Sequence, residues 1–202
     1  MYEVELKVRA DHGPVRRRLS ALDAEPLGTV EQADTYYGHP VRDFAETDEA
    51  LRIRRETCGG DGKGEAGADA DGHGETGADV DGASGADVRT LVTYKGPLFE
   101  DESKTREELE TGVEDGETMA AVLAELGFEA VETVEKTRER YRVGGYTVTL
   151  DTVDGLGEFL EVETDAETVE PAREGAVELL RELELDPAEQ VRTSYLGLLL
   201  EG

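Results

Sequence analysis

The chain has 202 residues, with 49 acidic and 21 basic side chains, and a formal net charge of -28 at pH 7. This length predicts a single domain over 1–202 that is able to bury a substantial core. So much negative charge repels nucleic acid and anionic membranes, so we expect neither as a partner. The one cysteine, Cys58, excludes an internal disulfide or a cysteine metal cluster. No apolar run approaches 18 residues, and we expect a cytoplasmic protein.

The basic residues are unevenly divided between lysine and arginine: five are Lys and 16 are Arg. Low Lys, abundant Asp and Glu, and few aromatic residues resemble the proteome bias of salt-adapted archaea. In molar salt the Debye length is about 3 Å, which screens the self-repulsion of such a chain. We therefore expect a halophilic protein that loses stability when salt is removed. Because lysines are rare, the places where they occur are informative.

Alternation of apolar and polar residues predicts strands. In chain order, the expected strands are 2–9, 29–37, 50–56, 88–95, 105–113, 131–143, 146–152 and 157–164. Apolar residues at helical spacing predict helices at 14–22, 117–126, 171–184 and 194–200. Gly144-Gly145 forms a two-residue hairpin turn between two of the strands. The predicted fold class is α+β, mainly β: an eight-stranded antiparallel closed barrel with helices packed outside.

Residues 57–90 differ in composition from the rest of the chain. Gly, Ala and Asp dominate, and the segment contains eight acidic and two basic side chains. Such a segment cannot bury enough apolar surface to offset its ordering entropy, so we expect a flexible insertion between strands. The alternative is a calcium loop, since GADADG and GADVDG echo aspartate-glycine calcium motifs. The Glu required at the twelfth position of an EF-hand loop is missing, which favours the flexible insertion.

The first strand places charged side chains on one face. Glu3, Glu5 and Lys7 alternate with Val4 and Leu6, so two carboxylates and an ammonium share one side and aliphatic groups the other. The alternation returns in later strands, at Arg52, Arg54, Arg106, Glu108, Glu110, Lys136, Arg138, Arg140, Glu161 and Glu163. A barrel built from such strands has a polar lumen with charges of both signs.

A lumen of mixed charge suits a polyphosphate together with its metal ions. Arg binds phosphate in a bidentate manner and Lys acts as a compact positive charge. Glu and Asp supply the hard oxygen ligands that Mg²⁺ or Mn²⁺ prefers. The alternative is that the cations form cross-strand ion pairs with neighbouring carboxylates. Ion pairing accounts for charge balance but not for the position of the rare lysines.

The combined motifs resemble the CYTH superfamily of triphosphate tunnel enzymes. Glu3-Val4-Glu5-Leu6-Lys7 is similar to the ExExK signature of that family. Further similar segments follow in order: LRIRR at 51–55, TYKGP at 93–97, KTREELE at 104–110, EKTRERY at 135–141 and LDTVDGLGEFLEVE at 150–163. TYKGP and the last segment resemble the class IV adenylate cyclase, or CyaB-type, branch. The resemblance covers the chain except for 57–90.

The resemblance implies an eight-stranded tunnel that binds a triphosphate with Mg²⁺ or Mn²⁺. It implies phosphate binding by Lys7, Arg52, Arg54, Lys95, Arg106, Lys136 and Arg138. Of these, Lys7, Lys95 and Arg106 are the expected catalytic residues. The implied metal ligands are Glu3, Glu5, Glu108, Asp151, Glu161 and Glu163.

Three functions remain open on the sequence. The first is a class IV adenylate cyclase that converts ATP into cyclic AMP and pyrophosphate. The second is a triphosphatase that hydrolyses tripolyphosphate, thiamine triphosphate or a nucleoside triphosphate. The third is a nucleotide- or polyphosphate-binding module without turnover. A homodimer is a further expectation from the resemblance.

The remaining histidines and tyrosines carry little functional signal. His12, His39 and His73 form no metal-spaced pair, so we expect surface residues. Tyr36, Tyr37 and Tyr195 are expected to be packing residues rather than catalytic ones; the alternative is that a tyrosine at the tunnel mouth contacts a nucleobase. No GxxxxGK[ST] motif occurs, which excludes a P-loop as the phosphate site.

Overall fold

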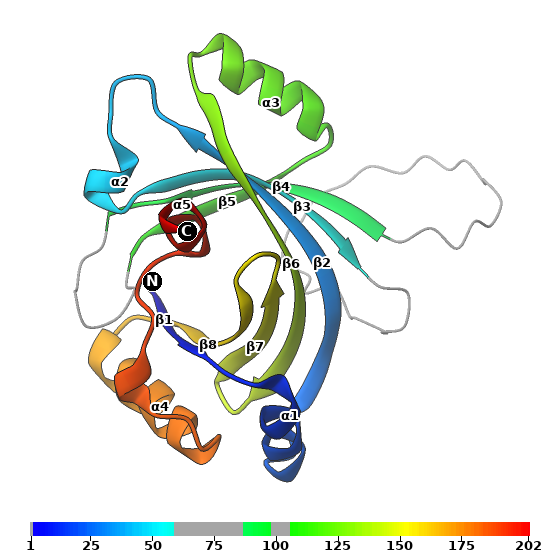
Figure 1. The fold of residues 1–202 in the computed structure, drawn as a ribbon, viewed down its shortest axis with the longest axis vertical. Coiled ribbons are helices and arrows are strands. Elements are labelled where there is room, and N and C mark those ends of the chain that lie inside the picture. Colours follow the sequence, from blue (N-terminus) through cyan, green and yellow to red (C-terminus); the bar gives the residue numbers. More distant parts are fainter. Residues whose placement is uncertain (1, 59–86, 98–105) are drawn as a thin grey trace, which may run out of the picture.

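The computed structural model describes residues 2–58, 87–97 and 106–202. Within these ranges, eight antiparallel strands form one sheet in the order β1-β8-β7-β6-β2-β3-β4-β5, and the sheet curls into a half-barrel (Figure 1). The strands are β1 (Tyr2–Arg9), β2 (Glu25–Gly38), β3 (Ala50–Cys58), β4 (Asp87–Lys95), β5 (Glu108–Val113), β6 (Glu129–Val143), β7 (Tyr146–Val153) and β8 (Gly157–Ala166). The predicted mainly-β, antiparallel α+β class is confirmed.

Two long strands and one hairpin extend further than their sequence patterns predict. β2 begins at Glu25 and β6 at Glu129, because the two strands pair along almost their whole length. β3 and β4 pair out to Cys58 opposite Asp87. Residues 57–58 and 87–90, which the composition assigns to the insertion, therefore belong to strands. The remainder of the predicted insertion, 59–86, lies outside the described residues.

The prediction of a fully closed barrel is not confirmed. β1 and β5 are the two edge strands of the sheet. In the described part of the chain, their edges approach through a bridge between Glu3 and Arg106, with Lys95 Nζ 3.0 Å from Glu3 Oε2. The sheet is thus a curled half-barrel whose edges come together near Glu3.

Helices α1 (His12–Ala21) and α4 (Val169–Glu182) cover the convex face of β1, β8 and β7 (Figure 1). Asp11 begins α1 by accepting a hydrogen bond from the Gly13 amide at 2.9 Å. Leu6, Leu160 and Leu180 are among the buried members of the core between these elements. The even-numbered residues of β1 therefore form the core, which leaves Glu3, Glu5 and Lys7 on the concave face.

Helix α3 (Gly116–Glu125) packs on the convex face of β2 and β3. Its Leu123 packs against Tyr37 and Ile53, from β2 and β3. Asp115 caps the helix by accepting a hydrogen bond from the Thr118 amide at 3.0 Å. Ile53 on the convex side places its neighbours Arg52 and Arg54 on the concave side.

Helix α5 (Tyr195–Glu201) does not pack outside the sheet, which corrects the sequence prediction for 194–200. Tyr195 packs against Val134, Val153 and Phe159, which share the face of the charged residues on their strands. Figure 1 shows α5 over the concave side, close to the C-terminus. Apolar residues at the end of the concave face pack against the helix. The spacing of apolar residues within the helix predicts that it packs, but not on which side of the sheet.

Two short elements were not predicted: helix α2 (Phe44–Thr47) and the 3₁₀ turn η1 (Pro187–Glu189). The predicted Gly144-Gly145 hairpin turn is present between the paired residues Val143 and Tyr146. Gly144 has a φ of 58°, a conformation that glycine adopts without strain. Among the described helices, none is both long and apolar enough to cross a membrane.

Candidate active site

The concave face lines a cavity of about 1210 Å³. All seven predicted phosphate ligands border it: Lys7, Arg52, Arg54, Lys95, Arg106, Lys136 and Arg138. Five of the six predicted metal ligands border it too: Glu3, Glu5, Glu108, Glu161 and Glu163. Their roles remain predictions, but strand alternation brings these side chains together as the sequence predicts. Asp151 is the exception, since it is fully buried behind the cavity wall.

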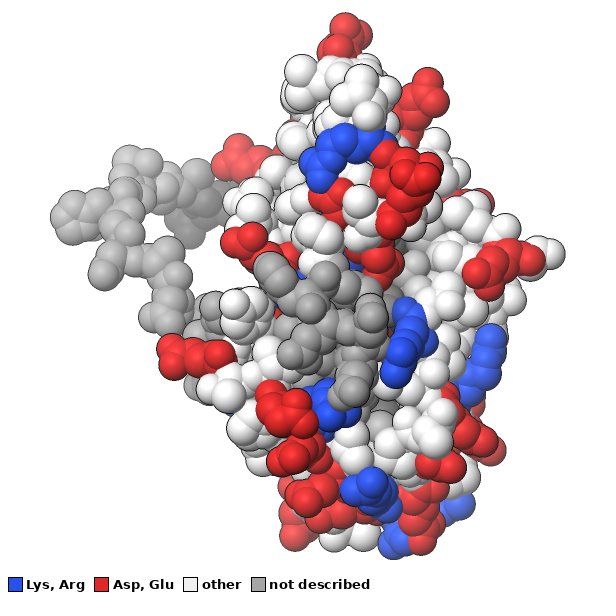
Figure 2. Space-filling view, turned by 90° about the vertical axis from the view of Figure 1, so that its left-hand side faces the viewer, with Lys and Arg blue, Asp and Glu red and all other residues white. Residues whose placement is uncertain are grey.

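The lysines are concentrated in this cavity. Lys7, Lys95 and Lys136 are the lysines in the described part of the chain, and all three border it. Lys7 is only 3% exposed. Figure 2 shows acidic side chains at both ends of one face of the molecule, with several basic side chains among them. The three described lysines therefore all lie in the interior of the half-barrel.

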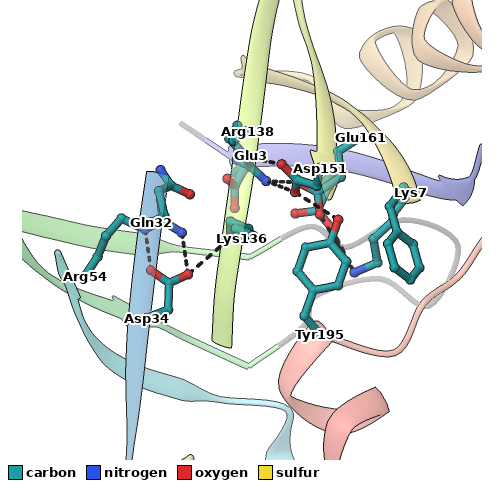
Figure 3. A network of polar contacts seen from close by, with 12 residues as sticks. Glu3, Lys7, Gln32, Asp34, Arg54, Lys136, Arg138, Asp151, Glu161 and Tyr195 are labelled. Carbon is teal, nitrogen blue, oxygen red and sulfur yellow. Dashed lines mark hydrogen bonds and ion pairs between the residues drawn. The ribbon is translucent and has the colours of Figure 1, made fainter. Parts of the chain in front are cut away.

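One carboxylate in the wall is surrounded by cations, and we call Asp34, Arg52, Arg54 and Lys136 the Asp34 cluster. Figure 3 shows Asp34 with Arg54 and Lys136. Arg54 donates two hydrogen bonds to Asp34, at 2.6 and 2.8 Å. Lys136 donates a third at 3.1 Å, and Arg52 a fourth at 3.3 Å. Burial alone raises the pKa of Asp34, but Lys136, Arg52 and Arg54 together hold it well below its usual range. Three cations around one anion leave a local excess of positive charge.

Lys136 is the cation of this cluster that titrates most easily. Burial lowers the pKa of Lys136 to about 8; Asp34 opposes this shift, while Arg54 and Arg138 add to it by repulsion. The Lys136 ammonium is thus poorly compensated. An additional anion next to it, such as a phosphate, would stabilise its charged form.

A second cluster joins β6, β7 and β8. Arg138 donates to both oxygens of Asp151, at 2.7 and 2.5 Å, and also to Glu161. Burial alone would raise the pKa of Glu161, but Arg138, Lys7 and Lys136 lower it. Since Asp151 accepts hydrogen bonds through both oxygens, it orients Arg138 in this arrangement.

Tyr195 connects α5 to both clusters (Figure 3). Its hydroxyl donates to Asp151 at 3.0 Å, and its ring centroid lies 4.4 Å from Lys7 Nζ and 5.4 Å from Lys136 Nζ. Cation–π contacts of this kind favour the charged amines. Burial, followed by Glu161 and Asp151, raises the pKa of Tyr195 well above its usual value. The C-terminal helix therefore supports two candidate phosphate ligands through one aromatic side chain.

The edge strands meet at an ion-pair network around Lys95. Its ammonium lies 3.0 Å from Glu3 and 2.6 Å from Glu108. Burial lowers the pKa of Lys95, but Glu3 and Glu108 reverse the shift and raise it overall. The network holds β4 and β5 against β1.

Three carboxylates form an acidic corner: Glu3, Glu5 and Glu163. Glu5 and Glu163 are directly opposed across β1 and β8, a placement that is unfavourable for like charges. Burial raises the pKa of Glu163 to about 7; Arg138 lowers it, and Glu161, Glu3 and Glu5 raise it further. At neutral pH this corner therefore attracts a proton or a cation.

The acidic corner fits the chemistry of a divalent metal ion. Its donors are carboxylate oxygens, the ligand type of Mg²⁺ and Mn²⁺. Among the described residues, no three His, Cys, Asp or Glu side chains are already arranged to hold a metal. Mg²⁺ is commonly held by one or two carboxylates plus substrate phosphates, so a preassembled group of three is not required. The residues that would hold it are Glu5 and Glu163, with Glu3 adjacent.

Arg106 forms a bridge with Glu3 of β1 and also contacts the β2–β3 connection. It donates to the Asp48 carbonyl at 2.6 Å and to the Asp48 carboxylate at 3.4 Å. Asp48 ends α2 in the β2–β3 connection, which borders the mouth of the cavity. Arg106 therefore links the charged interior to that loop.

Several polar residues of the site were not predicted from the sequence. Asp34 and Gln32 lie on the same face of the predicted strand 29–37 as Tyr36. The alternation of residues in that strand could therefore have identified them. Gln32 donates to Glu56, a buried carboxylate further along the same face. The prediction that Tyr195 only packs was incomplete, since its hydroxyl also donates to Asp151.

The histidine predictions require one correction. His12 is buried, because its ring lies at the start of α1 against β8, with Nε2 3.0 Å from the Phe159 carbonyl. His39 is half-buried against the rings of Phe44 and Phe128. His73 lies outside the described residues. Tyr37 is buried in the α3 core, as predicted.

Comparison with known proteins establishes the family. The model of the CYTH domain matches residues 1–195, so this chain belongs to the CYTH family. The matched region contains all the strands described above and ends at Tyr195, the first residue of α5.

Three relatives are similar over nearly their full length. A Methanocaldococcus jannaschii protein, named provisionally as an adenylate cyclase, is 36% identical, with 98% of each chain covered. The PH1819 protein of Pyrococcus horikoshii OT3 is 37% identical with a TM-score of 0.79, again with 98% of each chain covered. A protein from Hippeastrum, named provisionally as an adenylyl cyclase and described with a dominant triphosphatase activity, has 18% identity and a TM-score of 0.61. That match covers 100% of this chain and 95% of the other.

Proposed function

We propose that this protein is a metal-dependent enzyme that acts on a triphosphate held in the cavity of the half-barrel. Its primary activity would be that of a class IV adenylate cyclase, which converts ATP into cyclic AMP and pyrophosphate. The observation that carries the proposal is the convergence of seven buried or nearly buried cations and an acidic corner on one cavity. A relative that is 36% identical over 98% of this chain is provisionally named an adenylate cyclase, which supports the choice of reaction.

Mg²⁺ or Mn²⁺, held at Glu5 and Glu163, would supply neutralisation of phosphate charge and activation of the attacking hydroxyl. Around it, the Asp34 cluster and Arg138 bind the phosphate chain and fix its direction. The ribose 3′-oxygen attacks the α-phosphorus, the bond to the bridging oxygen breaks, and the hydroxyl proton is released. Lys7, Lys95 and Arg106 stabilise the charge on the departing pyrophosphate, the electrostatic contribution that dominates phosphoryl chemistry.

We also propose that the two edges of the sheet close around bound triphosphate as a tunnel. The Glu3–Arg106 bridge and the Lys95 ion pairs already bring β1 to β4 and β5. A phosphate chain bound across this seam would add contacts from both sides.

A second candidate function is triphosphate hydrolysis. The same cations would bind the chain, but water would attack the terminal phosphorus. The Hippeastrum relative, in which triphosphatase activity is described as dominant, favours keeping this candidate. Cations that bind phosphate serve both reactions, so the nucleophile and not the site distinguishes them.

One assay decides among these functions. The protein is incubated with ATP and, separately, with tripolyphosphate or thiamine triphosphate, in the presence of Mg²⁺ or Mn²⁺ and KCl, and the products are identified. The proposal predicts cyclic AMP with pyrophosphate in equal amounts. Orthophosphate in their place would support hydrolysis, and binding without product would leave a binding module.

A further inference from the structure

A second cavity lies next to the acidic corner, at the end of the sheet where β8 ends and the β6–β7 hairpin turns. Its volume is about 410 Å³, and we call it the hairpin cavity. Glu3 and Glu163 border both the hairpin cavity and the main cavity described above. Two of the three carboxylates of the acidic corner are therefore reachable from two sides.

Carboxylates lead from the hairpin cavity to the acidic corner. Across β1 and β8, Glu3 lies opposite Asp165, and Glu5 lies opposite Glu163. Side chains two residues apart in a strand share a face, so these two pairs form consecutive rungs on the same face. Asp165 is exposed, whereas Glu3, Glu5 and Glu163 are half-buried. The rungs thus run inward from solvent, and the opposed carboxylates of each rung favour a cation between them.

The main cavity approaches the same corner with the opposite charge. Lys95 Nζ lies 3.0 Å from Glu3, and Lys7 Nζ lies 3.9 Å from Glu5. Both lysines border the main cavity, and neither is among the described residues that border the hairpin cavity. A triphosphate in the main cavity would also fill the space in front of them. From this side a free divalent cation therefore meets either repulsion or an occupied cavity.

The hairpin cavity has a mainly acidic wall. Among the described residues that border it, three are carboxylates and one is a cation: Glu3, Glu163, Asp165 and Arg142. Arg142 is exposed near the end of β6. Thr147 of β7 pairs with Arg142 on one side and with Glu163 on the other, so a single strand separates the guanidinium from the corner. A positive charge at this entrance repels a passing cation and slows its passage.

We propose that the hairpin cavity is the route by which a divalent metal ion reaches and leaves the acidic corner. The ion exchanges there while a triphosphate stays in the main cavity, and Arg142 limits the rate of exchange. This inference rests on the proposed function, since it takes the metal ion to be held at Glu5 and Glu163. It adds that metal ion and triphosphate enter by separate openings and not as a preformed complex.

The test measures the release of Mn²⁺ and of a triphosphate from the same complex. The protein is loaded with Mn²⁺ and a radiolabelled non-cleavable triphosphate analogue, in the lowest KCl concentration at which it stays folded. It is then mixed with an excess of a fluorescent chelator that Mn²⁺ quenches. Stopped-flow fluorescence gives the release rate of Mn²⁺, and rapid filtration gives that of the analogue. We expect Mn²⁺ to leave first; release of both at one rate would show that they leave together through the main cavity and would overturn the route.

Two variants change the hairpin cavity itself. A Cβ at Gly145, which borders the cavity, meets no atom within 4 Å, so Gly145→Trp adds a bulky group without a clash at its base. We expect Mn²⁺ release to slow about tenfold, because this side chain has to move aside in a filled space. Arg142→Glu replaces a repelling charge by an attracting one, and should speed Mn²⁺ release about threefold. Both variants should leave the release of the analogue unchanged, which a general disturbance of the fold would not.

The matched controls are Gly145→Ala, which adds only a methyl group, and Arg192→Glu, the same charge change at an exposed residue that borders the main cavity. Neither should change Mn²⁺ release. Unchanged Mn²⁺ release in both hairpin-cavity variants, or faster release in Arg192→Glu instead, would overturn the route while leaving the metal site intact. If the unmodified protein binds no Mn²⁺, the proposed metal site fails and the route with it.

Discussion

The Asp34 cluster and the acidic corner lie in the same cavity but are organised in opposite ways. In the cluster, three cations surround one carboxylate, and its pKa is held well below the usual range. In the corner, carboxylates from neighbouring strands face one another, and the pKa of Glu163 rises to about 7. The first region has an excess of positive charge. The second is acidic, with Lys95 3.0 Å from Glu3 and Lys7 3.9 Å from Glu5.

Under the proposed function, the two regions would accommodate the two parts of a metal–triphosphate complex. A bound phosphate chain would relieve the repulsion among Arg54, Lys136 and Arg138. A bound divalent cation would relieve the repulsion between Glu5 and Glu163. Either ligand alone would leave the opposite region uncompensated, so we expect the two to bind cooperatively.

The largest expected effect of a single substitution comes from breaking the cationic region. Arg54→Ala removes two hydrogen bonds to Asp34 and a candidate phosphate ligand. Hydrogen bonds to charged groups contribute about 1.5–3 kcal/mol, so the Kd for tripolyphosphate should rise about 30-fold by titration calorimetry. The control is Arg55→Ala, one residue along β3 but exposed on the opposite face. An equal loss in both variants would show that general charge, and not the cavity, binds phosphate.

The second prediction concerns the acidic corner and pH. Below pH 7 a proton on Glu163 competes with a metal ion, since the pKa of this carboxyl is raised to about 7. The affinity for Mn²⁺ should therefore increase about tenfold per pH unit between pH 5 and 7 and level off above it. Electron paramagnetic resonance titration of Mn²⁺ measures this directly. Glu163→Gln should bind more weakly and without the pH dependence; an unchanged profile would place the metal elsewhere.

The third prediction uses the conservative replacement Lys136→Arg. Since burial lowers the pKa of Lys136 to about 8, its positive charge is lost as the pH rises above 8. Tripolyphosphate binding by the unmodified protein should weaken about fivefold between pH 7.5 and 9.5, because one close charge interaction is lost. Arginine stays protonated throughout this range, so the variant should show little change. Parallel pH profiles for both proteins would contradict the assignment.

The smallest effect is expected at Tyr195, which touches both clusters. Tyr195→Phe removes the hydrogen bond to Asp151 but keeps the ring next to Lys7 and Lys136. We expect a loss of about 1 kcal/mol in the free energy of unfolding by urea titration and about a threefold rise in the Kd for tripolyphosphate. Tyr195→Leu, which also removes the ring, should cost more affinity. Equal affinities of the two variants would assign Tyr195 to packing alone.

Much of this arrangement could be predicted because strands translate sequence alternation directly into faces. The two-residue period of a strand is enough to predict that Glu3, Glu5 and Lys7 share one face. Predicting the partner of each cation also requires the register between strands, which the alternation does not contain. Arg54 meets Asp34 because β3 pairs with β2, and Arg138 meets Asp151 because β6 pairs with β7.

Helix α5 illustrates a second limit of sequence reasoning. Its apolar residues predict a helix that packs on something, but not which side of the sheet it covers. The deciding residues are Val134, Val153 and Phe159, apolar side chains at otherwise charged strand positions. Each lies two residues from Lys136, Asp151 or Glu161, so it shares the polar face and marks where that face ends. The sequence contains this pattern, but it was not used to place the helix.

The most direct test of the account is a crystal structure with Mn²⁺ and a non-cleavable triphosphate analogue. The account predicts phosphate oxygens within hydrogen-bond distance of Arg54, Lys136 and Arg138. It also predicts an anomalous Mn²⁺ peak beside Glu5 and Glu163. Phosphates outside the cavity, or a metal ion bound away from the acidic corner, would contradict it.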